Sequence, residues 1–278
     1  MTVSAASPYA DECHAAIHAA DAAARIIRGH SGTMDGATAE EKGRNDLVTQ
    51  VDTAAQRAIV RVLTDAFPSH TMLAEEGAED EPLDPVADGY RWIIDPLDGT
   101  TNFTYDIPPY AVSIALQHEK HIVVGVVLDV PSEECFVAVR DQGAWVNGRP
   151  LRVSRTDALD KALVATGFPY RSYGHVDAYL DVLGTFMRRT RDLRRHGSAA
   201  VDLARVAAGR FGGFFETGLR PWDMAAGVLL VEEAGGTVTT YAGRQSPAPI
   251  FERQIVASNG AIHEDMRGIL ERMADVHA

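Results

Sequence analysis

Apolar side chains recur at helical spacing in two stretches near the start of the chain. They predict helices at about residues 15–27 and 52–67. Gly29 and Pro68 follow these stretches, and both residue types commonly stop a helix. Between the two stretches, residues 31–45 are rich in glycine, threonine and charge, which indicates a loop or a loose hairpin.

The middle of the chain has short apolar and alternating runs that are typical of paired β-strands. Acidic, turn-rich residues 77–89 come first and are expected to form a surface loop. The strand after them is expected to end at Asp95-Pro96, because proline fixes its own φ and interrupts a strand. The predicted strands cover residues 91–94, 111–117, 121–130, 136–140 and 143–148.

From about residue 160 onward, strand-like and helix-like patterns alternate. This alternation favours layered α/β packing. We expect a single domain with two halves, about 1–150 (α+β) and 151–278 (alternating α/β), with a soft boundary near 148–160. The predicted strands cover residues 162–166, 193–196, 211–216 and 254–257, and the predicted helices cover 175–188, 199–208, 224–234 and the C-terminal segment.

Composition and charge narrow the range of functions. The chain has 278 residues, of which 46% are hydrophobic, enough for one large domain or two tightly packed halves. Its formal net charge of -13 would repel a polyanion, so direct nucleic-acid binding is not expected. Cys13 and Cys135 are the only cysteines and lie in no CxxC motif, which fits a reducing cytoplasm. We expect neither a secretory signal nor a membrane span.

The strongest chemical motif is WIIDPLDGTTNF at residues 92–103. A buried strand would bring Asp95 to its carboxyl end, where α/β proteins usually bind ligands. Asp98 follows three residues later, so both carboxylates can face one point and offer oxygen ligands to Mg²⁺. The N–H groups of Gly99 and Thr100 could hold phosphate oxygens. Taken alone, the motif also fits a capped turn in which Asp98 accepts backbone hydrogen bonds.

Three further acidic positions strengthen the metal-binding interpretation, although each also has a structural explanation. Glu75 and Glu76 follow a short apolar strand, where an acidic pair is usually solvated. Asp223 precedes an apolar helical stretch and Asp52 begins the second predicted helix, so either could be a helix cap. The two interpretations are compatible, because a capping carboxylate is held rigidly and can still bind a metal ion.

Together these segments resemble the inositol monophosphatase family, within the lithium-sensitive, metal-dependent sugar phosphatase superfamily. The resemblance extends from residue 42 to about residue 259, nearly the whole chain. Where the family often has glycine before the Glu pair and serine or threonine after it, this chain has Ala74 and Gly77, and both leave the carboxylates in place. The matching segments are 42–43, 46–52, 74–76, 92–103, 197–200, 215–216 and 222–227.

The resemblance implies a fold, an assembly and a cofactor. The fold is an αβαβα five-layer sandwich, the assembly is a homodimer, and two to three Mg²⁺ ions bind between the metal-binding first half and the substrate-binding second half. Two ions about 3.5–4 Å apart would stabilise the attacking and leaving oxygens of an in-line displacement. The implied metal ligands are Glu75, Asp95, the carbonyl oxygen of Leu97, Asp98 and Asp223.

The resemblance also implies catalytic and substrate-binding residues. Thr100, oriented by Asp52, would position or deprotonate the attacking water, and Glu75 and Lys42 complete the catalytic set. Lys42 also fits a solvated loop residue. Glu216 would accept hydrogen bonds from ring hydroxyls, although it also fits a solvated strand end. The implied substrate-binding residues are Asp98, Gly99, Thr100, Gly197, Ser198, Ala199, Glu216 and Asp223.

The leading function is magnesium-dependent hydrolysis of myo-inositol 1-phosphate, or of a similar polyol or sugar phosphate, in the cytoplasm. Within the superfamily, the rivals are histidinol-phosphate phosphatase, fructose-1,6-bisphosphatase and 3′-phosphoadenosine nucleotidase. A rival from another class is a regulatory binding protein in RNA processing. The net charge argues against direct RNA binding, and the intact ligand set argues for an active enzyme.

One basic run stands out in this acidic chain. It fits a solvated helix end, a device that steers an anionic substrate, or a salt-bridged subunit interface. His196 follows it and is expected to be structural. The run contains Arg188, Arg189, Arg191, Arg194 and Arg195.

Overall fold

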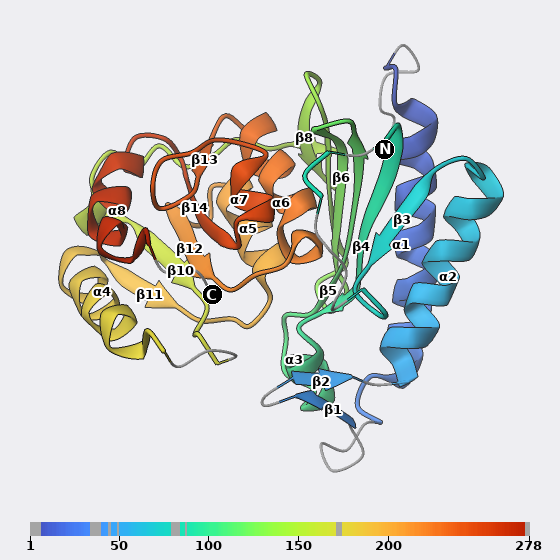
Figure 1. Cartoon of the computed structure of the whole chain (residues 1–278), viewed down its shortest axis with the longest axis horizontal. Coiled ribbons are helices and arrows are strands. Elements are labelled where there is room, and N and C mark those ends of the chain that lie inside the picture. The colour runs from blue at the N-terminus through green and yellow to red at the C-terminus, as the bar shows by residue number, and fades with distance from the viewer. Residues whose placement is uncertain are drawn as a thin grey trace.

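The chain folds into five layers, shown side by side in Figure 1. The computed structural model describes residues 7–33, 40–43, 46–48, 50–78, 84–86, 88–170 and 174–275. Helices α1 (Ala10–His30) and α2 (Gln50–Ala66) form one outer layer, and α4 (Val176–Arg189) and α8 (His263–Leu270) form the other. Two sheets enclose a central layer of α5 (Ala199–Ala207) and α6 (Pro221–Glu233). This arrangement confirms the expected αβαβα sandwich.

The first sheet has seven strands in the order β3-β4-β5-β6-β7-β8-β9. Only β3 and β4 run parallel, and all other neighbours are antiparallel. The chain therefore meanders through most of this sheet by short turns. The strands are β3 (Thr71–Ala74), β4 (Tyr90–Asp98), β5 (Ala111–His118), β6 (His121–Asp129), β7 (Glu134–Val139), β8 (Gly143–Val146) and β9 (Arg149–Pro150).

Both faces of the first sheet are covered, so its central strands are apolar on both sides. On β4, Trp92 and Ile94 pack into the core beneath α1 and α2, whereas Ile93 packs into the core of the central layer. Successive side chains of β4 therefore enter two different cores, which explains why the strand has a continuous apolar sequence. Alanines on the buried face of α1, such as Ala16 and Ala20, let this helix approach β5 and β6 closely.

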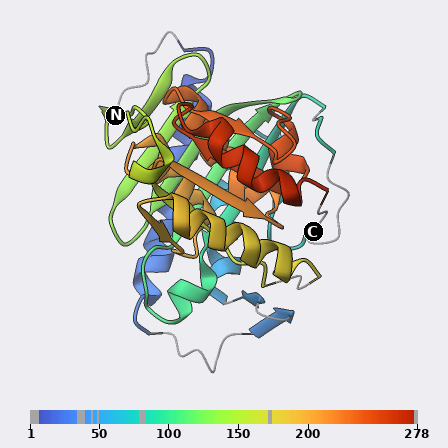
Figure 2. The same cartoon turned by 90° about the vertical axis from the view of Figure 1, so that its left-hand side faces the viewer.

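The second sheet has five strands in the order β11-β10-β12-β14-β13. Strand β10 runs parallel to both neighbours, and β14 runs antiparallel to β12 and β13. Helix α4 crosses the outer face of this sheet, as Figure 2 shows. The strands are β10 (Leu163–Thr166), β11 (Asp192–Arg194), β12 (Gly213–Thr217), β13 (Thr237–Thr239) and β14 (Gln254–Ser258).

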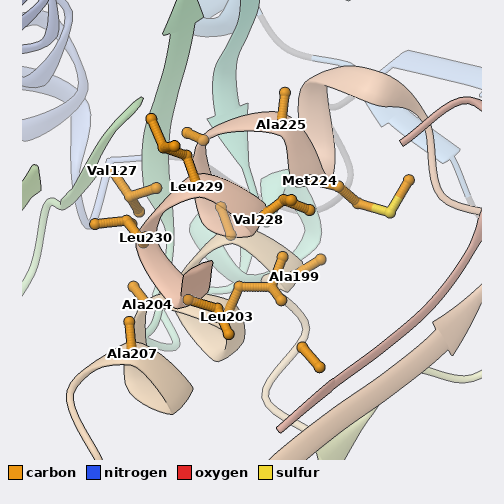
Figure 3. Packing of buried hydrophobic residues seen from close by; sticks show 14 of the residues in the cluster. Val127, Ala199, Leu203, Ala204, Ala207, Met224, Ala225, Val228, Leu229 and Leu230 are labelled. Atoms are coloured by element: carbon orange, nitrogen blue, oxygen red, sulfur yellow. The ribbon is translucent and has the colours of Figure 1, made fainter. Parts of the chain in front are cut away.

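The central helices pack tightly between the sheets. Figure 3 shows side chains of α5 and α6 in one apolar cluster with Val127 of β6. Helix α6 is buried around nearly its whole circumference, as expected for a helix with sheets on both sides. At its closest approach to the first sheet, a Cβ atom added to Gly125 of β6 would lie 2.8 Å from the carbonyl oxygen of Ala226. Glycine at position 125 therefore sets the spacing between α6 and the sheet.

Two details near the WIIDPLDGTTNF motif differ from the sequence-based expectation. Strand β4 does not end at Asp95-Pro96 but continues to Asp98, because an irregularity between Asp95 and Asp98 lets the chain pass the proline and pair again with Ala111. Helix α6 begins at Pro221, so Asp223 lies in its first turn and caps the helix from the third position of a capping box, not from the N-cap position. There the Asp223 carboxylate accepts a hydrogen bond from the backbone N–H of Arg220, at 2.6 Å.

Several short elements were not predicted, because two to five residues carry too little periodicity. They are β9, β13, α3 (Thr100–Thr104), α7 (Ala248–Phe251) and the 3₁₀ turns Leu159–Lys161 and Glu271–Met273. Within residues 31–45, β1 (Glu40–Gly43) pairs with β2 (Asp46–Val48), in agreement with the hairpin alternative. In the described part of the chain, no helix combines the length and apolar character needed to span a membrane.

The close approach of α6 to β6 predicts a steric effect on stability. Gly125→Ala should lower the free energy of unfolding by about 1–3 kcal/mol, because the added methyl group meets backbone atoms that cannot move aside. Gly268→Ala in α8 is the control, since no atom lies within 4 Å of its added Cβ. It should be neutral or stabilise by about 0.5–1 kcal/mol. Chemical denaturation measures both, and equal effects would contradict the packing account.

Candidate active site

A pocket of about 880 Å³ collects most of the predicted site residues. They come from segments far apart in the sequence, namely β3, β4, α3, α5, β12 and α6. The predicted residues that line it are Glu75, Asp95, Leu97, Asp98, Gly99, Thr100, Gly197, Ser198, Ala199, Glu216 and Asp223. Asp52 is buried behind the wall, and Lys42 lies on β1, where the structure describes the backbone but not the side chain.

Asp95 is the most deeply buried carboxylate of the pocket, with 1% of its surface exposed. Its Oδ1 accepts a hydrogen bond from the backbone N–H of Leu97 at 2.9 Å, which fixes the turn that the proline creates. Burial first, and then the charges of Glu75, Asp98 and Asp223, raise the pKa of Asp95 well above its ordinary value. These four carboxylates are therefore close enough to repel one another.

Asp98 joins the two halves of the molecule. Its Oδ2 accepts hydrogen bonds from the Ser198 hydroxyl at 2.6 Å and from the backbone N–H of Ala200 at 2.8 Å, at the start of α5. Both hydrogen bonds use the same oxygen, so Oδ1 remains for a ligand. Burial and the charge of Asp223 raise the pKa of Asp98 to about 7, although these hydrogen bonds oppose the shift. The predicted Gly197–Ser198–Ala199 loop thus orients this carboxylate.

Thr100 connects the pocket to the buried Asp52. The Thr100 hydroxyl lies 2.9 Å from Oδ1 of Asp52 and 3.0 Å from the carbonyl oxygen of Leu97, with a geometry that lets it donate to either. Asp52 has 1% of its surface exposed and belongs to the first turn of α2. The preceding Gly99 has φ of +95°, and a Cβ there would lie 3.2 Å from the carbonyl oxygen of Gly197. Only glycine fits this position comfortably.

Glu216 enters the pocket from β12, and it is half-buried there. Burial, and then the charges of Asp223 and Asp202, raise its pKa well above the ordinary value. A Cβ atom on Gly167 would lie 1.9 Å from the Glu216 carboxylate, so the carboxylate occupies the space that any other side chain at 167 would fill. Sequence reasoning missed Gly167, since nothing in the chain marks it as a neighbour of Glu216.

Sequence reasoning also missed part of the outer pocket wall. The additional lining residues include aromatic and basic side chains from the segments around residues 105, 170 and 253, which carry no recognised motif. They include Tyr105, Phe168, Tyr170, His175, Asp202 and Arg253. Arg195 also lines the pocket, and it belongs to the basic run for which steering of an anionic substrate was one interpretation. His196, expected to be structural, contacts Asp202 through its Nδ1 at 2.8 Å and stacks on Phe211.

The donor set of the pocket fits a hard divalent cation. Carboxylates and a backbone carbonyl are the ligands that Mg²⁺ prefers, and a cation would relieve the repulsion that raises the pKa of Asp95. Among the described His, Cys, Asp and Glu side chains, no three already form a complete ligand arrangement. The carboxylates line one pocket but do not converge on one ion position in this structure. The residues that could hold ions are Glu75, Asp95, Leu97, Asp98 and Asp223.

Comparisons with known proteins show the family of the chain. A model of the inositol monophosphatase family matches residues 10–274. The chain is 44% identical over 260 residues to the Nus factor SuhB of Escherichia coli, covering 94% of each chain. The solved extragenic suppressor protein suhB of Bartonella henselae has a TM-score of 0.85 at 38% identity, covering 93% of this chain and 97% of that one. The Thermotoga maritima IMPase has a TM-score of 0.84 at 33% identity, covering 96% and 100%.

The repulsion among these carboxylates predicts that charge removal does not destabilise the metal-free protein. A raised carboxyl pKa means that folding disfavours the ionised form, so above the folded pKa the Asp98 charge costs stability. Asp98→Asn, measured in chelator at about pH 8, should therefore leave the free energy of unfolding equal or higher.

Glu134→Gln is the matched control for Asp98→Asn. The hydrogen-bonded ion pair with Arg210 lowers the pKa of Glu134, so its loss should cost about 0.2–1 kcal/mol. A large destabilisation by Asp98→Asn would instead identify Asp98 as a structural turn residue.

Proposed function

The chain belongs to the inositol monophosphatase family, and we propose that it is a magnesium-dependent phosphomonoesterase acting on myo-inositol 1-phosphate or a similar polyol phosphate. The observation that carries the proposal is the pocket in which four carboxylates, the Thr100–Asp52 hydrogen bond and Glu216 meet. Family membership supports the phosphatase class, and the choice of substrate rests on the chemistry of the pocket.

Each carboxylate has a proposed place in the metal site. Glu75, Asp95 and the carbonyl of Leu97 hold one ion, and Asp95, Asp98 and Asp223 hold a second, while Glu75 contributes to a weaker third. Bound magnesium supplies Lewis-acid stabilisation of the phosphate and lowers the pKa of the attacking water. Asp98 contributes through Oδ1, because Oδ2 is occupied by Ser198 and Ala200.

The protein's own groups position the water and the phosphate. In the proposed reaction, the Thr100 hydroxyl accepts a hydrogen bond from the attacking water and donates its own hydrogen to Asp52, 2.9 Å away. Asp52 is buried and acts through Thr100, since it does not line the pocket. The backbone N–H groups of Gly99 and Thr100 hold phosphate oxygens at the start of α3, and Lys42 is proposed to complete the site from the β1–β2 hairpin.

Glu216 is proposed to select the alcohol part of the substrate. An ionised carboxylate accepts hydrogen bonds, and a ring polyol offers several hydroxyl donors. The Ala199 backbone lies in the same wall of the pocket. The same carboxylate would also suit the amine of histidinol phosphate, so this substrate is the main rival. Fructose 1,6-bisphosphate and 3′-phosphoadenosine nucleotides are further rivals that would use the same metal site.

The proposal includes an assembly and a location. A cytoplasmic homodimer follows from the family resemblance, with a small-molecule ester as the partner of the active site. The name of the Escherichia coli relative favours a second candidate, a Nus-factor role in which the protein acts by binding other macromolecules. Asp98→Asn, which should abolish hydrolysis, separates the two roles. If the protein acts only by binding, the variant should retain that function, and if it acts as an enzyme, the variant should lose it.

The first consequence of this function is metal dependence. A chelator such as EDTA should abolish phosphate release, because the four carboxylates cannot polarise the ester by themselves, and added Mg²⁺ should restore it. Phosphate release from myo-inositol 1-phosphate is the measurement. Full turnover in the presence of the chelator would disprove the metal-dependent mechanism.

Lithium should inhibit the enzyme, as the family resemblance implies. The small cation would occupy the second site and retain the product phosphate, so inhibition should deepen as Mg²⁺ or substrate increases. Sodium chloride at equal ionic strength is the control, since screening alone weakens the binding of a charged substrate. Unchanged rates in lithium would place the chain in an insensitive branch of the superfamily.

Substrate choice can be tested at Glu216. Glu216→Gln keeps the side-chain size but turns one acceptor into a donor, and should lower kcat/KM for myo-inositol 1-phosphate roughly 10- to 100-fold. With p-nitrophenyl phosphate, which has no ring hydroxyls, the loss should be much smaller. Gly167→Ala should reproduce the effect without any change in charge, because its methyl group displaces the Glu216 carboxylate.

The ratio of the two rates is the informative quantity, since it cancels changes in folded fraction or metal loading. An equal loss on both esters would mean that Glu216 supports the metal site. A large loss confined to histidinol phosphate would assign the pocket to the amine substrate.

A further inference from the structure

The structure separates the arginines of the basic run by what they contact. Arg189 lies near Asp265, with 3.6 Å between the charged groups, and Arg194 binds Asp192 at 2.6 Å. Arg195, the neighbour of Arg194, lines the active-site pocket, and Arg194 does not. Among the described residues, no carboxylate oxygen lies within 4 Å of the Arg195 guanidinium. Two adjacent residues of the same type thus have different surroundings.

Two aromatic rings hold the Arg195 guanidinium in place. Its central carbon lies 5.5 Å from the ring centre of Phe168 and 5.3 Å from that of Tyr170, and the two rings contact each other edge to face. Phe168 also packs against Tyr179, whose hydroxyl donates to the carbonyl oxygen of Gly167 at 2.7 Å. Cation–π stacking engages the faces of a guanidinium and leaves the N–H groups at its edge available.

The Arg195 guanidinium also lies against Gly197, which belongs to the predicted substrate-binding residues. Its Nη1 is 2.7 Å from the position that a Cβ atom on Gly197 would take. The carbonyl oxygen of Gly197 lies 3.2 Å from the corresponding position on Gly99, whose N–H is proposed to hold the phosphate. Gly197 therefore lies between the guanidinium and the proposed phosphate site.

The remaining pocket has room and opposite charge for a larger substrate. Pockets of about 300–1,000 Å³ enclose drug-sized ligands, so a volume of about 880 Å³ exceeds what a ring monophosphate needs. Glu216 and Asp202 make one side acidic, and the charge of Arg195 lowers the pKa of both carboxyls, although burial outweighs it. Arg195 adds a positive charge to the same pocket.

We propose that Arg195 is a specificity-determining residue that binds a second anionic group, a phosphate or carboxylate, on the substrate. The inference rests on the proposed phosphomonoesterase function and extends its substrate class from polyol monophosphates to esters that carry a second negative charge. A guanidinium that packs against two aromatic rings can bind such a group through two parallel N–H donors.

The test compares two adjacent arginines on two substrates. Parent, Arg195→Gln and Arg194→Gln proteins are assayed with Mg²⁺ on fructose 1,6-bisphosphate, which has a second phosphate, and on myo-inositol 1-phosphate, which has none. Arg195→Gln should lower kcat/KM for the bisphosphate roughly 10-fold or more beyond its effect on the monophosphate. Arg194→Gln removes the same charge one residue away and should change both substrates equally. Arg195→Lys, which keeps the charge without the planar donors, should fall in between.

The outcomes separate the inference from the function it rests on. Turnover of both esters by the parent, with the same loss on both in Arg195→Gln, would overturn the role of Arg195 and leave the phosphatase intact. If the parent hydrolyses neither ester, the proposed function fails. Calorimetric titration of the parent and of Arg195→Gln with the same ligands and Mg²⁺ then tests the role of Arg195 without turnover. Tighter binding of the bisphosphate that Arg195→Gln abolishes would then support the anion site, and equal binding by both proteins would overturn it. Thermal unfolding of each variant excludes loss of the fold as the cause.

Discussion

The mutual repulsion of carboxylates in one pocket is the constraint on which the rest of this structure depends. Glu75, Asp95, Asp98 and Asp223 share a space in which burial and neighbouring charges raise the pKa of Asp95 and Asp98. Such an arrangement is unfavourable for folding, since each ionised group is desolvated beside others of its own sign. The fold must hold these groups in place by other interactions, and a divalent cation bound among them would make the cluster favourable.

The interactions that hold the cluster also join the first sheet to the central helices. Asp98 ends a strand of the first sheet and binds the start of α5 through Ser198 and Ala200. Nearby, the buried amide of Asn102 donates to the carbonyl oxygen of Pro109 at 2.8 Å and to that of His196, in the loop before α5, at 2.6 Å. The motif that offers oxygen ligands is thus also a contact between layers, so the geometry of the site depends on how the layers pack.

The sequence predicted the parts of the site in which a chemical motif coincides with a strand or helix pattern. It did not predict contacts that form only because distant segments lie close together in the fold. The WIIDPLDGTTNF motif predicted a strand that delivers two carboxylates to one place, but the bulge that carries β4 past Pro96 depends on pairing with β5. The contact of Gly167 with Glu216 joins two strands and has no local pattern. Arg194 and Arg195 are equivalent in sequence, and only the fold directs one to Asp192 and the other into the pocket.

The central claim is that the four carboxylates form one site for divalent cations. The most direct measurement is a crystal structure of the protein soaked in Mn²⁺, with anomalous scattering used to locate the ions. The account predicts strong anomalous peaks bounded by Glu75, Asp95, Asp98 and Asp223, with Oδ1 of Asp98 turned toward a peak and Oδ2 still bound to Ser198. Peaks confined to other carboxylates, with this pocket lacking any, would contradict it.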